Sequence, residues 1–444
     1  MKKNQLLIVI LALASVFTAC KKDDNAELSA VSVTFQVVFD EQAIGLGLTP
    51  LNTEVTITNQ VNGQINKAKA DASGLVNFAS VIPGNYTVVS SLTIAAADYT
   101  TITGAYTDED VVFNANLNSV ISNASGTLKL EMKSGRLGDW VIKQIYYGGS
   151  STTDGAVFRD QFLEIYNNST EVLYADSLYI ALVNGVNTSS PDLLKNWFLP
   201  TGQYDWTKAV NMNNSKANTD YVYATTILRI PGTGKQYPVQ PGASLIIAQN
   251  ALNHKTPFTN NTGKEVTVKN PALTIDLSKA DFEGYYGDLP GINVYPTDID
   301  NPLVPNVQVV FRASDRDLIL DSRGQEAIVI FKSITDASTF LKFATPDITT
   351  IIGTTVQYPQ ISKELIIDGV ELAQTVETKR VAHRLPAEID AGFTFVPGGS
   401  YSSQSVIRKT SKTVNNRRVL KDSNNSSLDF DFLTIADPTK TVFK

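Results

Sequence analysis

The chain has 444 residues, a formal net charge of −7, two histidines and one cysteine. The acidic balance argues against a nucleic-acid partner, because phosphate binding needs a basic surface. A single thiol excludes an internal disulfide and a cysteine zinc site, and the length suggests two or three domains.

The first 19 residues have the pattern of a secretory signal peptide. Lys2 and Lys3 precede an apolar stretch, residues 6–14, and small residues follow it. The apolar stretch is too short to span a bilayer, which takes roughly 20 apolar residues. One alternative is an ordinary signal peptide that is cut near Ala19 with no further modification.

Thr18-Ala19-Cys20 resembles the lipobox of bacterial lipoproteins, although Phe17 stands where that motif usually has Leu. The resemblance implies that Cys20 is lipidated and that residues 20–28 form an acidic linker. Two or three acyl chains would anchor the protein durably, since one chain binds only reversibly. Lys22-Asp23-Asp24 resembles the surface-export signal of Bacteroidota lipoproteins, which implies an outer-membrane, surface-exposed protein. The alternative is a solvated run of charges.

Residues 29–118 are predicted to form a small β-sandwich. "VSVTFQVVF" (31–39) and "NTEVTITNQ" (52–60) alternate as strands do, with Val55 and Ile57 on one face. Turns at "DASG" and "IPGN" separate further strands, in which Val76, Phe78, Tyr86 and Val88 are expected to point inward. These motifs resemble prealbumin-like, carboxypeptidase-regulatory-like modules, which usually act as spacers.

Residues 125–444 are predicted to form a second, larger sandwich. The order "IYYGG", "FLEIYNNSTE", "PGASLIIA" and "GQEAIVIFK" resembles the lamin-tail-like immunoglobulin sandwich. The same order is similar to that of an uncharacterised Bacteroidota surface lipoprotein family. The resemblance implies an all-β fold of two β-sandwich domains and no established activity.

Two long insertions, at about 191–234 and 256–305, interrupt this sandwich and are rich in aromatic residues. Loops of this length are uncommon unless they are functional or disordered, and disorder goes with few aromatics. The rings could cover sandwich edges and fill satellite cores. They could instead form a recognition surface for a protein or a glycan. The candidate contact residues are Trp197, Tyr204, Trp206, Tyr221, Tyr285 and Tyr286.

Several clusters of Asp and Asn could either bind a metal ion or cap turns. Carboxylate and amide oxygens that suit calcium occur at Asp298, Asp300 and Asn301, and again at Asp315, Asp317 and Asp321. Asp422, Asn424 and Asn425 form a third group. Asp and Asn also cap turns by bonding their own backbone, and this is our interpretation, so no metal or cofactor is predicted. Arg408-Lys409 and Arg417-Arg418 are expected to lie on a solvated face.

Catalysis has little support. His254 and His383 lie in segments of turn character, and no G-x-S-x-G or H-E-x-x-H motif is present. Glu164 is the obvious carboxylate, but it should face away from the core and hydrogen-bond a nearby loop. The chain is therefore predicted not to be an enzyme.

We expect a non-enzymatic binding protein at the outer-membrane surface. Its possible partners are a TonB-dependent nutrient transporter, another surface protein, and a glycan or small-molecule ligand. The link to a transporter is an association by family. A structural or adhesive surface protein that binds protein or glycan through its aromatic loops is the alternative, and a hydrolase is a remote third.

Overall fold

The computed structural model describes residues 29–39, 43, 46–103, 110–122, 124–134, 140–169, 172–414 and 416–444. The predicted signal peptide, Cys20 and the Lys22-Asp23-Asp24 signal lie outside the described residues. Within the described part, no helix combines the length and the apolar character needed to cross a membrane.

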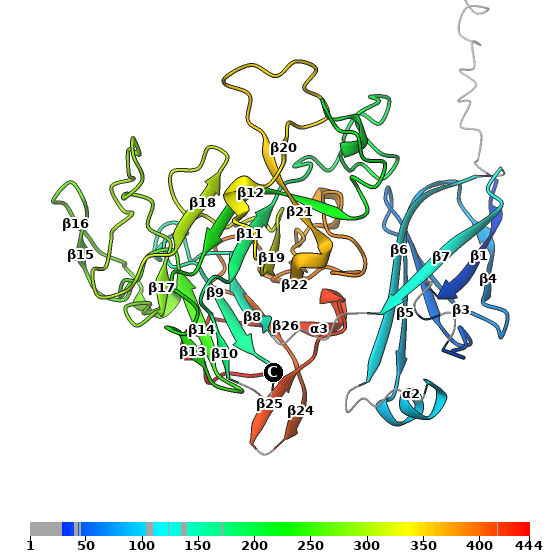
Figure 1. Ribbon diagram of the computed structural model, residues 1–444, viewed down its shortest axis with the longest axis horizontal. Helices are drawn as coiled ribbons and strands as arrows, with labels where there is room; N and C mark the ends of the chain where they lie inside the picture. Colours follow the sequence, from blue (N-terminus) through cyan, green and yellow to red (C-terminus); the bar gives the residue numbers. More distant parts are fainter. Residues whose placement is uncertain are drawn as a thin grey trace, which may run out of the picture.

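The first body is a sandwich whose strands form one sheet in the order β3-β2-β5-β6-β7-β1-β4 (Figure 1). A single core of Val, Ile and Phe side chains fills it, including the predicted Val55, Ile57, Val76 and Phe78. The alternating burial of β1 shows why this strand could be read from the sequence. Its elements are β1 (Val31–Phe39), β2 (Glu54–Asn59), β3 (Ile65–Lys69), β4 (Leu75–Val81), β5 (Gly84–Ile94), α2 (Ala96–Thr103), β6 (Val111–Ile121) and β7 (Thr127–Ser134).

Strand β7 corrects the predicted boundary between the two bodies. We assigned residues from 125 onward to the second sandwich. Instead, β7 runs parallel to β1, with Phe35 opposite Leu128, and also pairs with β6. Its side chains Leu130 and Met132 are buried in the first core. Periodicity identifies a strand but not its pairing partner, and this is why the boundary was placed too early.

The second body contains two large sheets that pack face to face (Figure 1). One has the order β20-β21-β12-β11-β19-β22, with β18 paired to β12, and the other has the order β17-β14-β9-β8-β23-β26. Their strands are β8 (Trp140–Tyr146), β9 (Phe162–Asn167), β11 (Tyr179–Val183), β12 (Tyr221–Arg229), β14 (Ser244–Ala248), β17 (Phe282–Glu283), β18 (Gln308–Arg312), β19 (Ala327–Phe331), β20 (Lys342–Phe343), β21 (Tyr358–Ser362), β22 (Ile366–Glu371), β23 (Ser405–Arg408) and β26 (Phe430–Leu433).

Short elements lie around the two sheets and connect their strands. The short strands are β10 (Leu173–Tyr174), β13 (Pro238–Val239), β15 (Phe258–Thr259), β16 (Glu265–Val266), β24 (Thr410–Val414) and β25 (Arg417–Leu420). The helical turns are η1 (Trp206–Lys208), η2 (Pro271–Leu273), η3 (Ala337–Thr339), η4 (Lys363–Leu365), η5 (Glu377–Lys379) and α3 (Ser426–Asp429).

Both faces of each large sheet are buried. The main core lies between the sheets and takes Ile165 of β9 and Ile328 of β19. A second core, with Val329 and Ile389, covers the outer face of the β11-β12-β19 sheet. A third, with Ile246, covers the outer face of the other sheet. Central strands such as β9 and β19 are therefore buried at every position, as in sheets covered on both sides.

One predicted insertion is shorter than expected. We placed residues 191–234 in a single insertion, but Tyr221–Arg229 is β12, a central strand paired with β11, β18 and β21. Its Tyr- and Thr-rich sequence suits a strand that is buried on both faces, and we read this composition as an aromatic loop.

Glu164 does point away from the main core, but its partners are neighbouring strands and not a loop. Lys143 Nζ of β8 lies 2.9 Å from Glu164 Oε1, with both side chains fully buried. Gln144 and Ser244 also donate to this carboxylate, at 3.1 and 2.5 Å. The C-terminal tail closes over the pair, with the Phe443 ring 4.0 Å from Lys143 Nζ.

Arg408 is also buried, which corrects the prediction of a solvated face. Its guanidinium lies 2.6 Å from Asp368 of β22 and 3.0 Å from Asp422, with Asp429 at 3.6 Å. Its Nε donates to the Ile142 carbonyl at 2.8 Å. Because β22 and β8 belong to different sheets, this one side chain joins the two sheets at their edge.

The same segment also contacts the first body. The amide of Asn114, on β6, donates to the carbonyl of Ser423, next to Asp422. The β2–β3 turn at Gly63 lies against the carboxylate of Glu377. The first body therefore contacts the larger one at Ser423, in the loop beside Arg408, and at Glu377 of η5.

Replacing Arg408 with Leu should destabilise the larger body by about 3–5 kcal/mol, because buried carboxylates lose the charge that compensates them. Urea unfolding followed by tryptophan fluorescence measures this change. The matched control is Arg418→Leu on the exposed side of β25, which should cost less than about 1 kcal/mol. Equal losses in the two variants would contradict the account.

Candidate functional site

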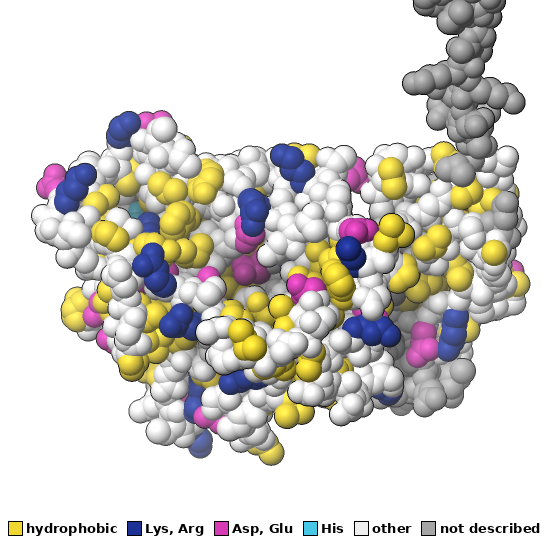
Figure 2. Space-filling view, turned by 90° about the horizontal axis from the view of Figure 1, so that it is seen from above, with side chains coloured by type: hydrophobic (Ala, Val, Ile, Leu, Met, Phe, Trp, Pro, Cys, Tyr) yellow, Lys and Arg dark blue, Asp and Glu magenta, His cyan; other side chains and the backbone are white. Residues whose placement is uncertain are grey.

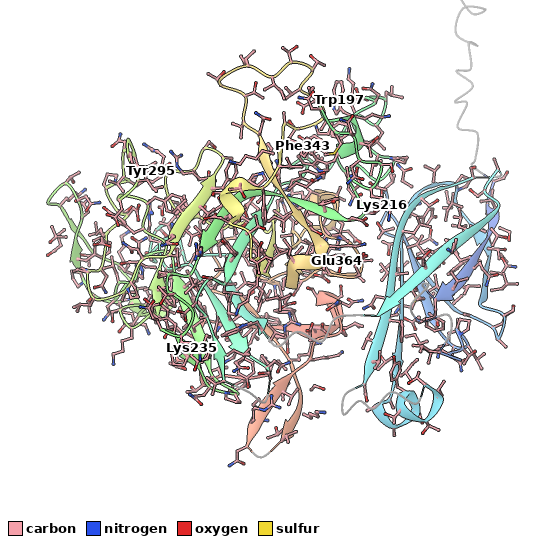
Figure 3. All side chains as sticks on the ribbon, viewed as in Figure 1. Trp197, Lys216, Lys235, Tyr295, Phe343 and Glu364 are labelled. Carbon is pink, nitrogen blue, oxygen red and sulfur yellow. The ribbon has the colours of Figure 1, made fainter. Side chains whose placement is uncertain are left out.

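The candidate site is a pocket between the start of β12, the loop that follows β11, and the segment 382–384. Its cavity volume is about 30 Å³. Trp206, Tyr204 and Tyr221 contribute its aromatic wall, and Asn184, Asn218 and Arg384 contribute its polar wall. Figure 3 labels Lys216 and Trp197, which come from the same long loop as Tyr204 and Trp206, and Phe343, which packs in the same cluster as Trp206.

The inner aromatic side of the pocket is a packed satellite core. Trp206 is 6% exposed and stacks on Tyr223 with ring centroids 3.6 Å apart. The Asp205 carboxylate accepts from the Thr207 backbone nitrogen at 3.1 Å, which starts the helical turn that holds Trp206. The interpretation that these rings fill a satellite core is therefore correct for Trp206.

The outer aromatic side is partly open. Tyr204 and Tyr221 are half-buried and pack on the satellite core. Tyr204 stacks on Phe198 at 5.6 Å, across a short antiparallel bridge. Trp197 is also half-buried, but it does not line the pocket.

Three buried polar atoms on the other wall have no hydrogen-bond partner: Asn184 Nδ2, Asn218 Oδ1 and Arg384 Nε. The other end of the Asn218 amide donates to the Tyr204 carbonyl at 2.7 Å, and this bond orients the free oxygen. The Asn184 amide approaches the Tyr358 hydroxyl without a hydrogen bond of normal geometry. Buried polar atoms are nearly always satisfied, so this group is suited to a ligand that supplies donors and acceptors.

Arg384 is held in place on three sides. Its guanidinium reaches Glu371 at 3.4 Å, the Gln325 carbonyl at 2.7 Å and Asn187 at 2.9 Å. Gly185 makes room for it, because a Cβ there would lie 2.6 Å from the Arg384 side chain. The positive charge is already balanced, so Arg384 offers a directed N–H and no free cation.

His383 stands beside Arg384 and is best described as an imidazolium. Its Nδ1 lies 3.0 Å from the Leu385 carbonyl and its Nε2 lies 2.7 Å from the Gly392 carbonyl. Two carbonyl partners require two N–H donors, which only the protonated ring supplies. Burial alone would lower the pKa of His383, but the carboxylates of Glu371 and Asp390 and these carbonyls outweigh it and raise the pKa.

The other predicted contact residues lie elsewhere. Tyr286 is fully buried in the main core, so it cannot contact a partner and that prediction was wrong. Aromatic character alone did not separate it from its neighbour Tyr285, which is half-buried and outside the pocket.

A second cavity, of about 20 Å³, lies within the main core and has apolar walls, apart from Gln161 and Gln249. Its lining belongs to the packing between the sheets, for example Leu182 and Ile328. It offers no set of converging polar atoms comparable to that of the first pocket.

Neither histidine is placed for acid–base work. His254 is buried, and burial lowers its pKa to about 4, so it is neutral. Both nitrogens of His383 face backbone carbonyls. The described residues thus contain no histidine with a free nitrogen directed at a hydroxyl nucleophile, as a Ser-His-Asp arrangement needs.

Sequence reasoning found Tyr204, Trp206 and Tyr221 but missed Asn184, Asn218 and Arg384. The aromatic residues can be recognised from the composition of the insertion, whereas the polar residues come from three separate segments that only the fold brings together. The one available signal was the "VNGVN" stretch, in which a glycine between amides marks a close backbone approach.

Comparisons with known proteins find a solved structure with a similar fold. A family model described as a protein of unknown function, DUF4876, matches residues 240–436. A crystal structure of a DUF4876 family protein from Bacteroides thetaiotaomicron is 24% identical, covers 90% of this chain and 94% of its own, and has a TM-score of 0.52. The two chains therefore share an all-β fold. A search of curated proteins finds no match.

More distant similarities are partial. A candidate carbohydrate-binding protein from Pseudomonas aeruginosa is 14% identical over 23% of this chain and 89% of its own, with a TM-score of 0.18. A candidate adhesin from Bacteroides thetaiotaomicron is 10% identical over 37% of this chain and 57% of its own, with a TM-score of 0.18. Scores this low carry no argument about this chain.

The protonation of His383 is directly measurable, because the chain has only two histidines. In a proton NMR titration one imidazole signal should titrate above the ordinary 6.5 and the other near 4. His383→Gln should remove the first signal. The raised pKa means that the stabilisation is complete below about pH 6.5 and is lost as the pH rises through the folded-state pKa. If the signal removed by the substitution titrates at or below 6.5, the imidazolium assignment is wrong.

Proposed function

We propose that this chain is a non-enzymatic cell-surface binding protein whose pocket takes one sugar residue of a glycan. The observation that carries the proposal is the set of unpartnered amide and guanidinium atoms opposite half-buried tyrosines. Small-ligand sites combine apolar walls with a few directed polar groups. The cavity volume of about 30 Å³ has room for about two hydroxyl groups, so the pocket would take the edge of the sugar and leave most of its ring at the mouth.

A sugar fits this chemistry because each hydroxyl both donates and accepts a hydrogen bond. Asn218 Oδ1 would accept, while Asn184 Nδ2 and Arg384 Nε would donate. The apolar face of a sugar ring can pack on Tyr221 or Tyr204, which are the half-buried rings of the lining.

The charges favour a neutral sugar over an acidic one. Arg384 is paired with Glu371, and His383 lies 3.6 Å from the same carboxylate. Asp390 also acts on His383. No positive charge is left in excess to balance a ligand carboxylate, so an acidic sugar would be buried at a cost.

A hydrolase is disfavoured by the positions of its required groups. A glycosidase needs two carboxyl groups on either side of a bound sugar, yet the pocket lining contains neither Asp nor Glu. The histidines are engaged or buried.

The N-terminal sequence supports a location for this binding protein at the outer-membrane surface. Cys20 would carry the lipid, and Lys22-Asp23-Asp24 would direct the protein to the outer face of the outer membrane. A binding protein tethered there could serve as an accessory to a TonB-dependent nutrient transporter, to which it would deliver the glycan.

An adhesive role is the second candidate, and exposed apolar side chains favour it. Leu194 is 95% exposed and Ile352 is 63% exposed, each on a long loop of the larger body. Figure 2 shows apolar side chains in separate groups on one face, with charges scattered among them. Surface groups of this kind suit contacts with another protein.

Binding to a glycan array, followed by calorimetry, tests the pocket. The double variant Asn218→Ala and Tyr221→Ala should weaken binding at least tenfold, since it removes one hydrogen bond and one ring contact. Tyr285→Ala is the matched control, because Tyr285 is a half-buried aromatic outside the pocket and should leave affinity unchanged. Binding to whole cells that survives the double variant would favour the adhesive role.

Metabolic acyl labelling tests the address and the partner together. The wild-type protein should carry the label and co-purify from outer membranes with a transporter. Cys20→Ala should lose both, because the thiol that accepts the lipid is gone. Label on the variant would refute the lipobox assignment, and a labelled wild type that brings down no outer-membrane protein would refute the accessory role.

A further inference from the structure

Two aspartates from separate candidate clusters of the sequence lie in the same part of the folded protein. The backbone N–H of Ile299 donates to Asn250 Oδ1 at 2.8 Å, which places Asp298 beside the segment that carries Gln249, and Gln249 bonds Asp317. Asp298 belongs to the loop after β17, and Asp317 belongs to the loop after β18. Asp298 is 0% exposed and Asp317 is 1% exposed. The Arg159 guanidinium donates to Asp317 Oδ2, and Gln249 Nε2 donates to the same oxygen at 3.3 Å. Figure 3 labels Tyr295, from the same region, on the side of the larger body opposite Lys216.

Four oxygen atoms at this place accept no hydrogen bond. They are both carboxylate oxygens of Asp298, Oδ1 of Asp317 and Oε1 of Gln249. Gln249 is 2% exposed, so all three side chains are shielded from water. Because Gln249 Nε2 is bonded to Asp317, its free oxygen is fixed beside the same carboxylate. A buried carboxylate that accepts no hydrogen bond is costly, and such a concentration of free acceptors calls for a partner.

The charges point to a cation. Asp298 and Asp317 carry two negative charges against the single positive charge of Arg159, which is engaged with Asp317 Oδ2. A positive ion bound to the free oxygens would balance this excess of negative charge and satisfy the buried acceptors. The donors are all oxygen and the Asp298 carboxylate can bind through both of its atoms, which suits calcium better than magnesium or zinc.

We propose that Asp298, Asp317 and Gln249 bind a divalent cation, calcium by preference, with water completing its shell. The described residues contain no group of three or more His, Cys, Asp and Glu placed to hold a metal, so the proposed protein ligands are two carboxylates and one amide oxygen. The ion would connect the end of β14 to the loops after β17 and β18, and thus fasten the outer cover of the β8-β9-β14 sheet. The inference is independent of the sugar pocket.

Thermal unfolding of the chelator-treated protein tests the site. Calcium at about 100 times its dissociation constant should raise the Tm by roughly 5 °C, because an ion that binds only the folded state stabilises it by mass action. Magnesium should raise it less. Asp298→Asn should abolish the response, whereas Asp288→Asn, an exposed carboxylate in the same region, should retain it.

Terbium luminescence gives a second reading at the same place. The Tyr295 ring lies 5.4 Å from the Arg159 guanidinium and can sensitise a bound terbium ion. Emission should appear in the wild type and in Asp288→Asn and disappear in Asp298→Asn. If Asp298→Asn fails to fold, Gln249→Met should still fold and should weaken calcium binding about tenfold.

Two results would overturn the proposal. The first is a Tm that responds to neither calcium nor magnesium. If Asp298→Asn is then also more stable than the wild type in chelator, the two carboxyl groups share a proton and bind no ion. The second is a calcium response that is equal in Asp298→Asn and Asp288→Asn, which would place the ion elsewhere.

Discussion

The larger body depends on burying both faces of both of its sheets. The two sheets share one core, and each then needs a cover on its outer side. Long connections between strands supply that cover, which explains their length and their content of aromatic and apolar residues. Charged side chains that are buried between a sheet and its cover need partners of opposite charge beside them. Lys143 with Glu164, and Arg408 with its three aspartates, are the two main examples.

The covers also explain where ligand sites can occur. Strand positions are filled on both sides, so open space with directed polar groups arises where two cover segments meet. The pocket of Tyr221 and Arg384 lies at such a junction, and the Asp298–Asp317 group lies at another. In both places buried polar atoms are left without partners.

Much of the fold was predictable from local patterns, because alternation of apolar side chains reports directly on strands with one buried face. This applies to β1, β2 and β4 of the first body. The same rule was less useful in the larger body, where strands are buried throughout. Residues 221–229 therefore looked like part of an insertion, and Arg408 looked solvated because its aspartate partners lie on other segments.

Only some residues of the candidate pocket could be predicted from the sequence, for a related reason. Tyrosine and tryptophan stand out by composition, but Tyr286 shows that composition does not separate a core ring from a contact ring. Asn184, Asn218 and Arg384 are ordinary residues until the fold leaves one atom of each unpaired. Sequence spacing carries no information about which hydrogen bonds remain unmade.

The most direct test of the account is a crystal structure of the protein grown with a neutral oligosaccharide that binds in solution. The account predicts a sugar ring against Tyr221 or Tyr204, with hydroxyls bonded to Asn218 Oδ1 and Arg384 Nε. A sugar bound at another surface, with this pocket filled by water or by rearranged side chains, would contradict it.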